Sequence, residues 1–282
     1  MVSFEEFIYS KPRRRLKICI SICIAFALYS CDFEKEVEVK LPPYEKLLVA
    51  ECYIERGQPL RMLLLETDPY FDTLRFPFIN NANVSLNMYG KTTRIDPLGY
   101  LDFPARKFYN YNSAAALDYD TLGSISLAIV DSLGRKLEGQ TRFLPIPDFD
   151  SIEVKYNNDP DSLASFVMWL NDFPGQSDYY RLIFNEDSLT GSPSLEFTFT
   201  DQNLDGKRFP IGTSYRFKPK KTMFIRLFHI EQQYYNYIRS LDAASRANGN
   251  PFAQPATIAS PMKGKGYGIF TSLNKKQYEI KY

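Results

Sequence analysis

Few residues in this 282-residue sequence carry side chains suited to catalysis, and their spacing restricts the chemistry they could perform. The chain has one histidine, His229, so every mechanism that needs an imidazole depends on that residue. It ends a run of alternating apolar residues, and no G-x-S-x-G motif supplies a nucleophile to pair with it. We therefore predict that His229 lies at a strand end, satisfied by a hydrogen bond. No catalytic residue is expected.

The segment Asp201–Gly206, DQNLDG, matches the first half of a calcium-binding loop, in which oxygen ligands alternate and a glycine makes the sharp turn. The twelfth position of such a loop, which needs a bidentate glutamate, is Gly212. Asp, Asn and Gly are also frequent in turns between strands. We therefore predict a hairpin turn, with no metal and no other cofactor.

Aromatic residues make up 15% of the chain, and flat rings can stack on sugars and peptides at a small entropic cost. The candidates for such a surface are Tyr109, Tyr111, Tyr234, Tyr235 and Tyr237. Tyrosine is also frequent on sheet surfaces and at helix interfaces, and this structural role is the favoured interpretation. Trp169 alternates with Val167 and is expected in the core rather than in a binding surface.

Aspartate followed by Ser or Thr and then an apolar residue occurs six times, whereas composition alone predicts about one such triplet. The triplet resembles the O-glycosylation acceptor of Bacteroidota, and surface loops tolerate glycans. Asp-Ser is also ordinary turn chemistry, so both interpretations stay open. The candidate acceptors are Thr73, Thr121, Ser132, Ser151, Ser162 and Ser188.

The N-terminal region carries the features of an export signal. A basic cluster precedes an apolar run from Ile18 to Leu28, which is too short to span a bilayer comfortably. Leu28 to Cys31 resembles a bacterial lipobox, and the following DFEKEVEVK resembles the signal that sends Bacteroidota lipoproteins to the outer face of the outer membrane. We predict a signal peptide over residues 1–30, a lipidated Cys31 and an acidic tether over residues 31–46.

The remainder of the chain is predicted to be mainly β. Short runs of period two, bounded by Gly, Pro, Asn and Asp, indicate a β-sandwich of immunoglobulin or transthyretin type over residues 47–145, with hairpin turns at residues 55–59 and 132–135. Residues 149–282 are predicted to form a second β-rich domain, in which IGTSYRF (residues 211–217) is one of five strand candidates before the helix and GYGIFTSL and QYEIKY are the last strands. Cys52 shares a strand face with apolar residues and is expected to be a buried structural thiol.

One helix is predicted at residues 231–247, where apolar residues repeat at helical spacing and Gly249 follows as a stop signal. The Pro- and Gly-rich segment after it, Asn250 to Gly266, is long for a simple connection and is predicted to be a contact loop. The residues expected to make its contacts are Pro251, Phe252, Lys263, Lys265 and Tyr267.

Two blocks of the chain carry a family resemblance. CDFEKEVEVKLPPYEKLLVAECYIERGQPLRMLLLETDPYF near the front and YYNYIRSLDAASRANGNPFAQPATIASPMKGKGYGIF near the end resemble the Bacteroidota lipoprotein family known as domain of unknown function 4249. The resemblance implies a surface-directed lipoprotein encoded beside TonB-dependent outer-membrane receptors. It implies no catalytic or binding residue.

The expected function is therefore that of a non-catalytic lipoprotein, anchored to the outer membrane and facing the cell exterior. It would assist a TonB-dependent receptor in binding a small-molecule or oligomeric nutrient, with a groove between the two domains as the first place to look. The formal net charge of +1 gives no reason to expect a nucleic-acid partner. Two alternatives stay open. The first is a surface-anchored hydrolase that uses Asp or Glu, because a catalytic carboxylate pair has no fixed spacing along the sequence. The second is a structural or adhesive protein.

Overall fold

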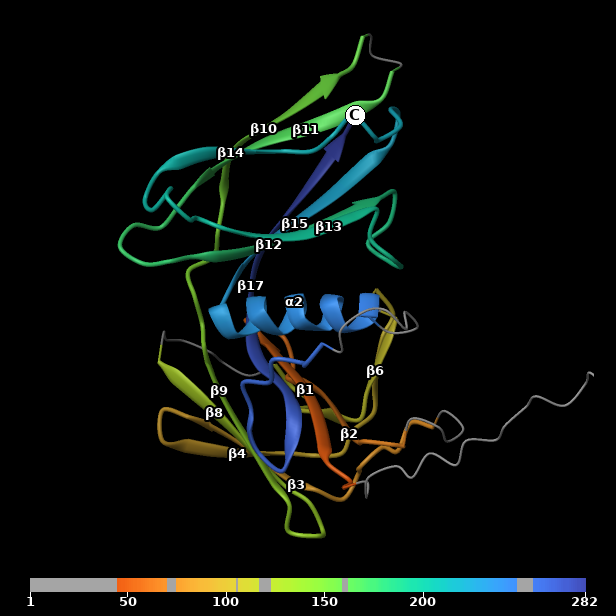
Figure 1. Ribbon diagram of the computed structural model, residues 1–282, viewed down its shortest axis with the longest axis vertical. Helices are drawn as coiled ribbons and strands as arrows, with labels where there is room; N and C mark the ends of the chain where they lie inside the picture. Colours follow the sequence, from red (N-terminus) through yellow and green to blue (C-terminus); the bar gives the residue numbers. More distant parts are fainter. Residues whose placement is uncertain (1–44, 70–74, 105, 117–122, 159–161, 248–255) are drawn as a thin grey trace, which may run out of the picture. The chain divides into compact units, whose positions relative to one another are not determined.

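The computed structural model describes residues 45–69, 75–104, 106–116, 123–158, 162–247 and 256–282 (Figure 1). The fold is mainly β, as the alternating pattern predicted: the described residues contain 17 strands and one helix. Residues 45–282 form one compact unit. No helix among these residues is long and apolar enough to span a membrane.

The strands of the first half begin with a hairpin, β1 (Leu48–Glu55) and β2 (Arg61–Glu66), as predicted from the turn-forming residues between them. A second predicted hairpin, β8 (Ser124–Val130) and β9 (Lys136–Arg142), is also present. The other strands of this half are β3 (Asn83–Met88), β4 (Lys91–Ile95), β5 (Tyr100–Asp102), β6 (Lys107–Tyr109) and β7 (Tyr111–Asn112).

The strands of the second half follow the predicted segments, with one displacement. β14 covers Arg208–Gly212, whereas a strand was predicted over residues 211–217. The turn-forming residues after Gly212 end the strand there. The others are β10 (Phe149–Tyr156), β11 (Ala164–Asn171), β12 (Tyr179–Glu186), β13 (Leu195–Thr200), β15 (Thr222–Ile230), β16 (Lys263–Gly264) and β17 (Gly266–Lys281).

Strand β17 differs from the sequence prediction, which divided it into two strands. It is one strand of 16 residues that changes partner along its length. Its first part pairs in parallel with β1, up to Leu273 opposite Glu55. Its second part pairs antiparallel with β15, from Asn274 opposite His229. The backbone stays extended at the change of partner because the residues before it are hydrogen-bonded to β1 and the residues after it are hydrogen-bonded to β15.

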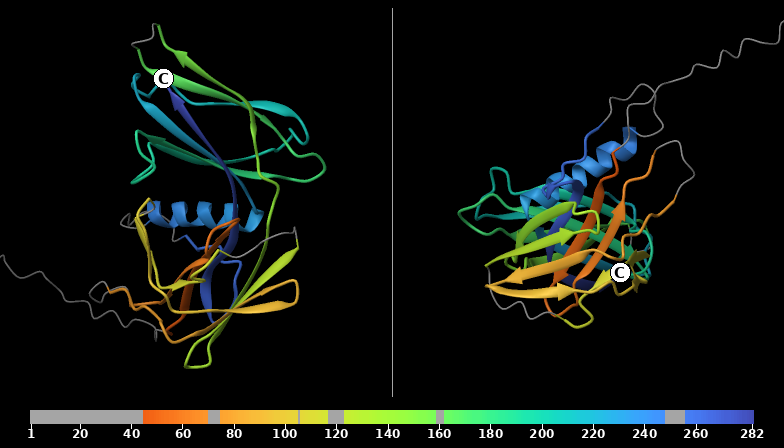
Figure 2. Two further views of the ribbon diagram at one scale, coloured as in Figure 1. Left: turned by 180° about the vertical axis from the view of Figure 1, so that it is seen from behind. Right: turned by 90° about the horizontal axis from the view of Figure 1, so that it is seen from below.

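This change of partner joins both halves in one seven-stranded sheet of order β13-β12-β15-β17-β1-β2-β7. A five-stranded sheet, β16-β9-β8-β3-β4, and a three-stranded sheet, β10-β11-β14, accompany it. Figure 2 shows the strands of these layers from two further sides. The predicted division into two domains at residues 145–149 stays a prediction.

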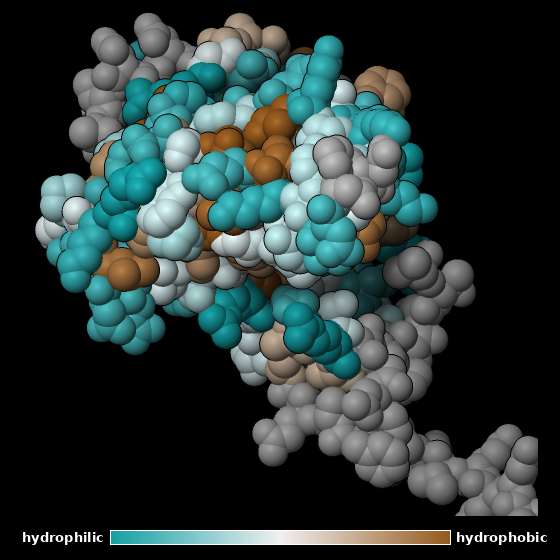
Figure 3. Space-filling model, turned by 90° about the horizontal axis from the view of Figure 1, so that it is seen from above, coloured by the Kyte–Doolittle hydropathy of each residue, from teal (hydrophilic) through white to brown (hydrophobic). Residues whose placement is uncertain are grey.

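Two hydrophobic cores lie on one face of the seven-stranded sheet. The first contains the even-numbered residues of β1, including Cys52, which is fully buried as predicted. The second contains Tyr180, Leu182 and Phe184 of β12. Several side chains packed against the second core are only partly buried, and Figure 3 shows hydrophobic surface in the middle of the face on which β10 and β11 lie.

The helix, α2 (Gln232–Ala247), begins one residue after its predicted start and packs against β12 and β17. Tyr234 and Tyr237 are its buried residues, and they belong to a third apolar cluster together with Ile183, Phe228 and Ile269. These strand positions alternate with those that face the two cores. The helix therefore covers the opposite face of the seven-stranded sheet.

The position predicted for Trp169 is wrong. Its neighbours Met168 and Leu170 are fully buried, whereas Trp169 is half-buried on the other face of β11. The guanidinium carbon of Arg208 lies 4.2 Å from the centre of its ring. The face of β11 with more apolar residues, which includes Met168 and Leu170, packs in the core. Trp169 lies on the other face, where it makes a cation–π contact with Arg208.

Candidate ligand-binding pocket

A pocket of about 500 Å³ lies on the face of the seven-stranded sheet that carries α2. Strands β1, β2, β12, β13, β15 and β17 contribute its floor, and β5, β6, α2 and the loop between β12 and β13 contribute its walls. Pockets of this size that combine aromatic and apolar walls with a few polar groups are typical of small-molecule sites.

Strand register explains why distant residues meet on the pocket floor. Phe228 of β15 lies opposite Lys275 of β17, and Arg226 lies opposite Gln277. Ile183 of β12 lies opposite Arg226 on its other side. Paired residues point to the same face of a sheet, so residues that alternate with core positions gather here as one surface of charged, polar and apolar side chains.

Tyrosine rings form one wall of the pocket. Tyr53 lies edge-on to Tyr109 and to Tyr234, with ring centres 6.4 Å and 6.1 Å apart. Tyr100 lies 6.4 Å from Tyr109. Burial raises the pKa of Tyr53, Tyr109 and Tyr234 above the ordinary value of tyrosine, so their phenols stay neutral and can donate or accept hydrogen bonds.

Most of the charged side chains in the pocket are paired. Arg61 Nη1 lies 2.6 Å from Asp102 Oδ2, and Arg61 Nη2 lies 3.4 Å from Glu55 Oε2. Glu55 Oε1 also lies 2.7 Å from Lys275 Nζ. These pairs fix the geometry of the pocket, because each long side chain is held by a partner on a neighbouring strand.

A second ion pair lies beside α2. Arg181 Nη2 is 2.6 Å from Glu196 Oε1, and Arg181 Nη1 donates to the Tyr234 hydroxyl at 2.8 Å. All three acidic residues that line the pocket, Glu55, Asp102 and Glu196, are therefore engaged by a cation. Each of these carboxylates is therefore neutralised by a cation of the protein itself.

Arg226 differs from the other cations of the pocket. Its Nη2 donates to Asn185 Oδ1 at 2.8 Å, but the side chain makes no ion pair with any residue that the structure describes. Its Nε is buried without a hydrogen-bond partner. Burial and the nearby Arg181 guanidinium lower the pKa of Arg226. Arg226 is half-buried, and a cation that is partly withdrawn from water beside a like charge is costly, so this position favours an anionic group from outside the chain.

The pocket thus combines hydrogen-bonding tyrosines with an excess of cations. Five basic and three acidic residues line it; the basic ones are Arg61, Lys107, Arg181, Arg226 and Lys275. One more carboxylate, Glu51, pairs with Lys107 from outside the lining. Guanidinium groups bind carboxylates and phosphates, and tyrosine rings stack on sugar rings. The arrangement suits a small polar molecule that carries a negative charge.

The sequence predicted only part of this pocket. Of the five tyrosine candidates, Tyr109 and Tyr234 line it. Tyr111 has the structural role that was favoured, since it is fully buried and its hydroxyl accepts a hydrogen bond from the Ala82 amide at 2.9 Å. Tyr237 is buried and Tyr235 half-buried, and neither lines the pocket. The arginines were missed because they come from separate strands and share no spacing.

The role predicted for His229 is confirmed. It lies at the end of β15, where Nδ1 contacts the Pro145 carbonyl and Nε2 contacts Asp178 Oδ1, both at 3.0 Å. The turn predicted at Asp201–Gly206 is also present. It joins β13 to β14, however, and these strands belong to different sheets, so the turn is not a hairpin.

The other predicted site residues lie apart from the pocket. Lys263 of β16 lies opposite Glu138 of β9 in the strand pairing at the edge of the five-stranded sheet. Lys265 forms an ion pair with Glu45, and Tyr267 is exposed. Pro251 and Phe252 lie outside the described residues. A contact role for this segment stays a prediction.

The predicted modification sites are described only in part. Cys31, Thr73 and Thr121 lie outside the described residues. Among the other candidate acceptors for glycans, Ser132 and Ser188 are exposed, whereas Ser151 and Ser162 are half-buried. Lipidation and glycosylation stay predictions.

Comparison with protein-family models gives a match. A family model described as a domain of unknown function (DUF4249) covers residues 34–279, nearly the whole described fold. No curated protein matches the chain.

Proposed function

The chain belongs to the DUF4249 family, and we propose that it is a non-catalytic binding protein, held by a lipid at Cys31 on the outer face of the outer membrane. In this role it assists a TonB-dependent receptor in taking up a small polar nutrient. The observation that supports ligand binding is the pocket in which Arg226 has no anionic partner among the described residues.

The proposed ligand carries a carboxylate or phosphate together with several hydroxyl groups. The anionic group would pair with Arg226, and the hydroxyl groups would exchange hydrogen bonds with the phenols of Tyr53, Tyr109 and Tyr234. A sugar acid such as glucuronate has both features and is the simplest probe.

The support for a binding role over hydrolysis comes from the acidic residues of the pocket. A glycosidase needs one carboxyl as a proton donor and a second as a base or nucleophile. Asp102, Glu55 and Glu196 each make an ion pair with an arginine. Such pairs suit groups that shape a pocket rather than a proton donor.

Binding can be tested with glucuronate, citrate and inorganic phosphate added separately to the full-length protein in detergent, with the unfolding temperature as the readout. We expect at least one of these anions to raise it, because a ligand that binds only the folded state stabilises that state. Arg226→Gln should weaken the binding about tenfold or more, since it removes a charged hydrogen-bond donor.

Arg208→Gln is the matched control, because Arg208 is also a strand arginine but lies outside the pocket against Trp169. Equal loss of binding in both variants would contradict the assignment of the pocket.

The cellular role can be tested by isolating the natively anchored protein from outer membranes and identifying its partners by mass spectrometry. We expect a TonB-dependent receptor to co-purify. Isolation of the protein alone, with the lipid anchor intact, would contradict the accessory role and leave the binding test unaffected.

A further inference from the structure

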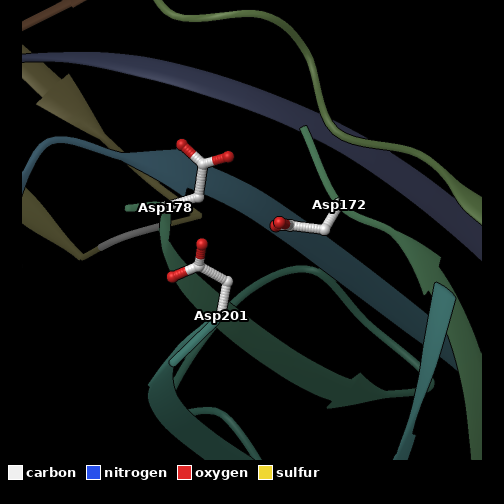
Figure 4. A group of neighbouring side chains, drawn as sticks. All are labelled: Asp172, Asp178 and Asp201. Atoms are coloured by element: carbon white, nitrogen blue, oxygen red, sulfur yellow. The ribbon is translucent and has the colours of Figure 1, made fainter. Parts of the chain in front are cut away.

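A second group of charged residues lies apart from the pocket. Asp172 follows β11, Asp178 precedes β12 and Asp201 follows β13. One carboxylate oxygen from each lies within 4.8 Å of the others. Figure 4 shows the Asp172 carboxylate turned toward the other two side chains. We call these three residues the aspartate cluster.

Backbone hydrogen bonds hold the aspartate cluster in place. The Asp201 amide donates to the Asp178 carbonyl at 3.2 Å, and the Asp172 amide donates to the Lys207 carbonyl at 3.2 Å. The Asp172 side chain accepts hydrogen bonds from the Tyr180 hydroxyl at 2.7 Å and from the Gly206 amide at 2.9 Å. The three carboxylates thus come from two loops that are bound to each other.

The aspartate cluster is buried and lacks compensating charge. The exposed fractions of Asp172, Asp178 and Asp201 are 7%, 2% and 4%. No lysine or arginine in the described part of the chain makes an ion pair with them, and His229 is the one basic side chain in contact. Three buried carboxylates without cations are strongly unfavourable, so the site needs positive charge from outside the chain.

One oxygen of the cluster has no hydrogen-bond partner. Asp178 Oδ1 contacts His229 Nε2 at 3.0 Å and accepts from Gln176 Nε2 at 2.9 Å. Asp178 Oδ2 is buried and makes no hydrogen bond within the described residues. Buried polar atoms without partners are rare in folded proteins, and an ion is one of their explanations. This oxygen therefore points independently to a ligand.

We propose that Asp172, Asp178 and Asp201 bind a calcium ion. Calcium–oxygen distances of 2.3–2.6 Å put ligands on opposite sides of one ion about 4.6–5.2 Å apart, which accommodates the spacing of the cluster. Calcium accepts carboxylate oxygens in a flexible geometry, whereas magnesium demands a near-ideal octahedron and usually keeps several waters. Oxygen ligands alone also favour a hard cation over zinc or copper.

Neighbouring residues complete the calcium site. Asp178 and His229 line a second cavity of about 530 Å³, so the cluster borders on a space from which an ion would enter. His229 is a positioning residue that holds Asp178 Oδ1 and leaves Oδ2 available to the ion. The ring of His229 is itself held between Phe173 and Tyr180, whose ring centres lie 5.1 Å and 5.3 Å away.

The site differs from the calcium loop suggested by the motif DQNLDG. Of that motif, Asp201 is in the cluster, whereas the Asp205 side chain accepts a hydrogen bond from the Gly175 amide at 2.8 Å. The other two ligands come from the preceding loop. Asp201→Asn and Asp205→Asn are therefore a matched pair of variants that separate the two kinds of site.

Calcium binding to the full-length protein, stripped of metal with a chelator, is measured by titration calorimetry. We expect one calcium ion per chain with a dissociation constant of about 0.1–1 mM, the range of extracellular calcium modules. Addition of calcium at about 100 times this constant should raise the unfolding temperature by about 5 °C. Asp201→Asn and Asp178→Asn should abolish both effects, and Asp205→Asn should retain them.

Terbium luminescence on the wild-type protein keeps the proposal testable if a variant fails to fold. Terbium replaces calcium on oxygen ligands, and Tyr180, hydrogen-bonded to Asp172, would sensitise its emission. We expect an emission that calcium displaces. The proposal is overturned if wild-type protein gives neither heat with calcium nor displaceable emission, or if folded Asp201→Asn binds calcium as tightly as the wild type does.

Discussion

The ligand-binding pocket and the aspartate cluster bury charge in opposite ways. In the pocket every lining carboxylate has a cationic partner, and Arg226 is left without an anion. In the cluster only Asp178 contacts an imidazole, and Asp178 Oδ2 has no donor among the described residues. The cluster is buried, whereas Arg226 is half-buried in the lining of the pocket.

This difference indicates how each region would be completed. Burial of an uncompensated charge costs stability, and a ligand of opposite sign recovers that cost when it binds. The pocket would accept an anion of the size of a sugar acid, whereas the cluster would accept a single cation.

The largest effect is expected at the backbone that carries the pocket floor. Gly268 in β17 has a φ of +147°, and a Cβ there would lie 1.8 Å from the Ala50 carbonyl oxygen of β1. Gly268→Ala should therefore lower the free energy of unfolding by more than about 3 kcal/mol, measured by urea denaturation.

Gly212→Ala provides the control, because a Cβ at Gly212 meets no atom within 4 Å. If Gly268→Ala unfolded at the same urea concentration as this control, that result would contradict the close pairing of β17 with β1 on which the pocket floor depends.

The next prediction concerns the stability of the aspartate cluster with and without bound calcium. Without calcium, Asp201→Asn should raise the free energy of unfolding by about 1 kcal/mol, because it removes one of three like charges. With calcium at saturation the wild type should be the more stable of the two by about 1–3 kcal/mol, since only the wild type binds the ion. Urea denaturation with calcium and with chelator measures both values, and an unchanged order would contradict a metal site.

Two arginines of the pocket should respond in opposite directions. Arg226→Gln should raise the free energy of unfolding by about 1 kcal/mol without ligand, because it removes a half-buried cation beside Arg181. Arg61→Gln should lower it by about 1–3 kcal/mol, because it removes the ion pairs of Arg61 with Asp102 and Glu55. Thermal unfolding of both variants measures this difference, and a similar loss in both would show that Arg226 is satisfied within the chain.

The smallest effect concerns Glu231, whose pKa is raised by burial above its ordinary value of 4.5, although Thr141, Gln233 and Arg142 oppose the shift. A raised pKa means that the folded state prefers the protonated form, so the wild type loses stability as pH rises through this range. Glu231→Gln should be equal to the wild type near pH 4 and more stable near pH 7, by less than about 1 kcal/mol. An advantage that is constant with pH would contradict the shift.

The sequence predicted the local parts of this fold well. The β1–β2 and β8–β9 hairpins and α2 follow from turn residues and periodicity within short windows. The parallel pairing of β1 with β17 did not follow, because residues 48–55 and 266–273 carry no local sign that they meet. Trp169 was assigned to the wrong face because both faces of β11 are apolar in sequence.

The two sites were less accessible to prediction for the same reason. Tyr109 and Tyr234 were identified from residue type, but the unpaired state of Arg226 depends on contacts between strands. Asp201 was visible as part of a motif, whereas Asp172 and Asp178 acquire their role from the hydrogen bonds that join two loops. Charge balance in a buried site is a property of the folded state, and spacing along the chain does not report it.

The most direct test measures the unfolding temperature of the full-length wild type, Arg226→Gln and Asp201→Asn with calcium chloride and with sodium glucuronate, each added alone. We predict that calcium stabilises the wild type and Arg226→Gln but not Asp201→Asn. Glucuronate should stabilise the wild type and Asp201→Asn but not Arg226→Gln. Loss of both responses in either variant, or the absence of both in the wild type, would contradict the assignment of two independent sites of opposite charge.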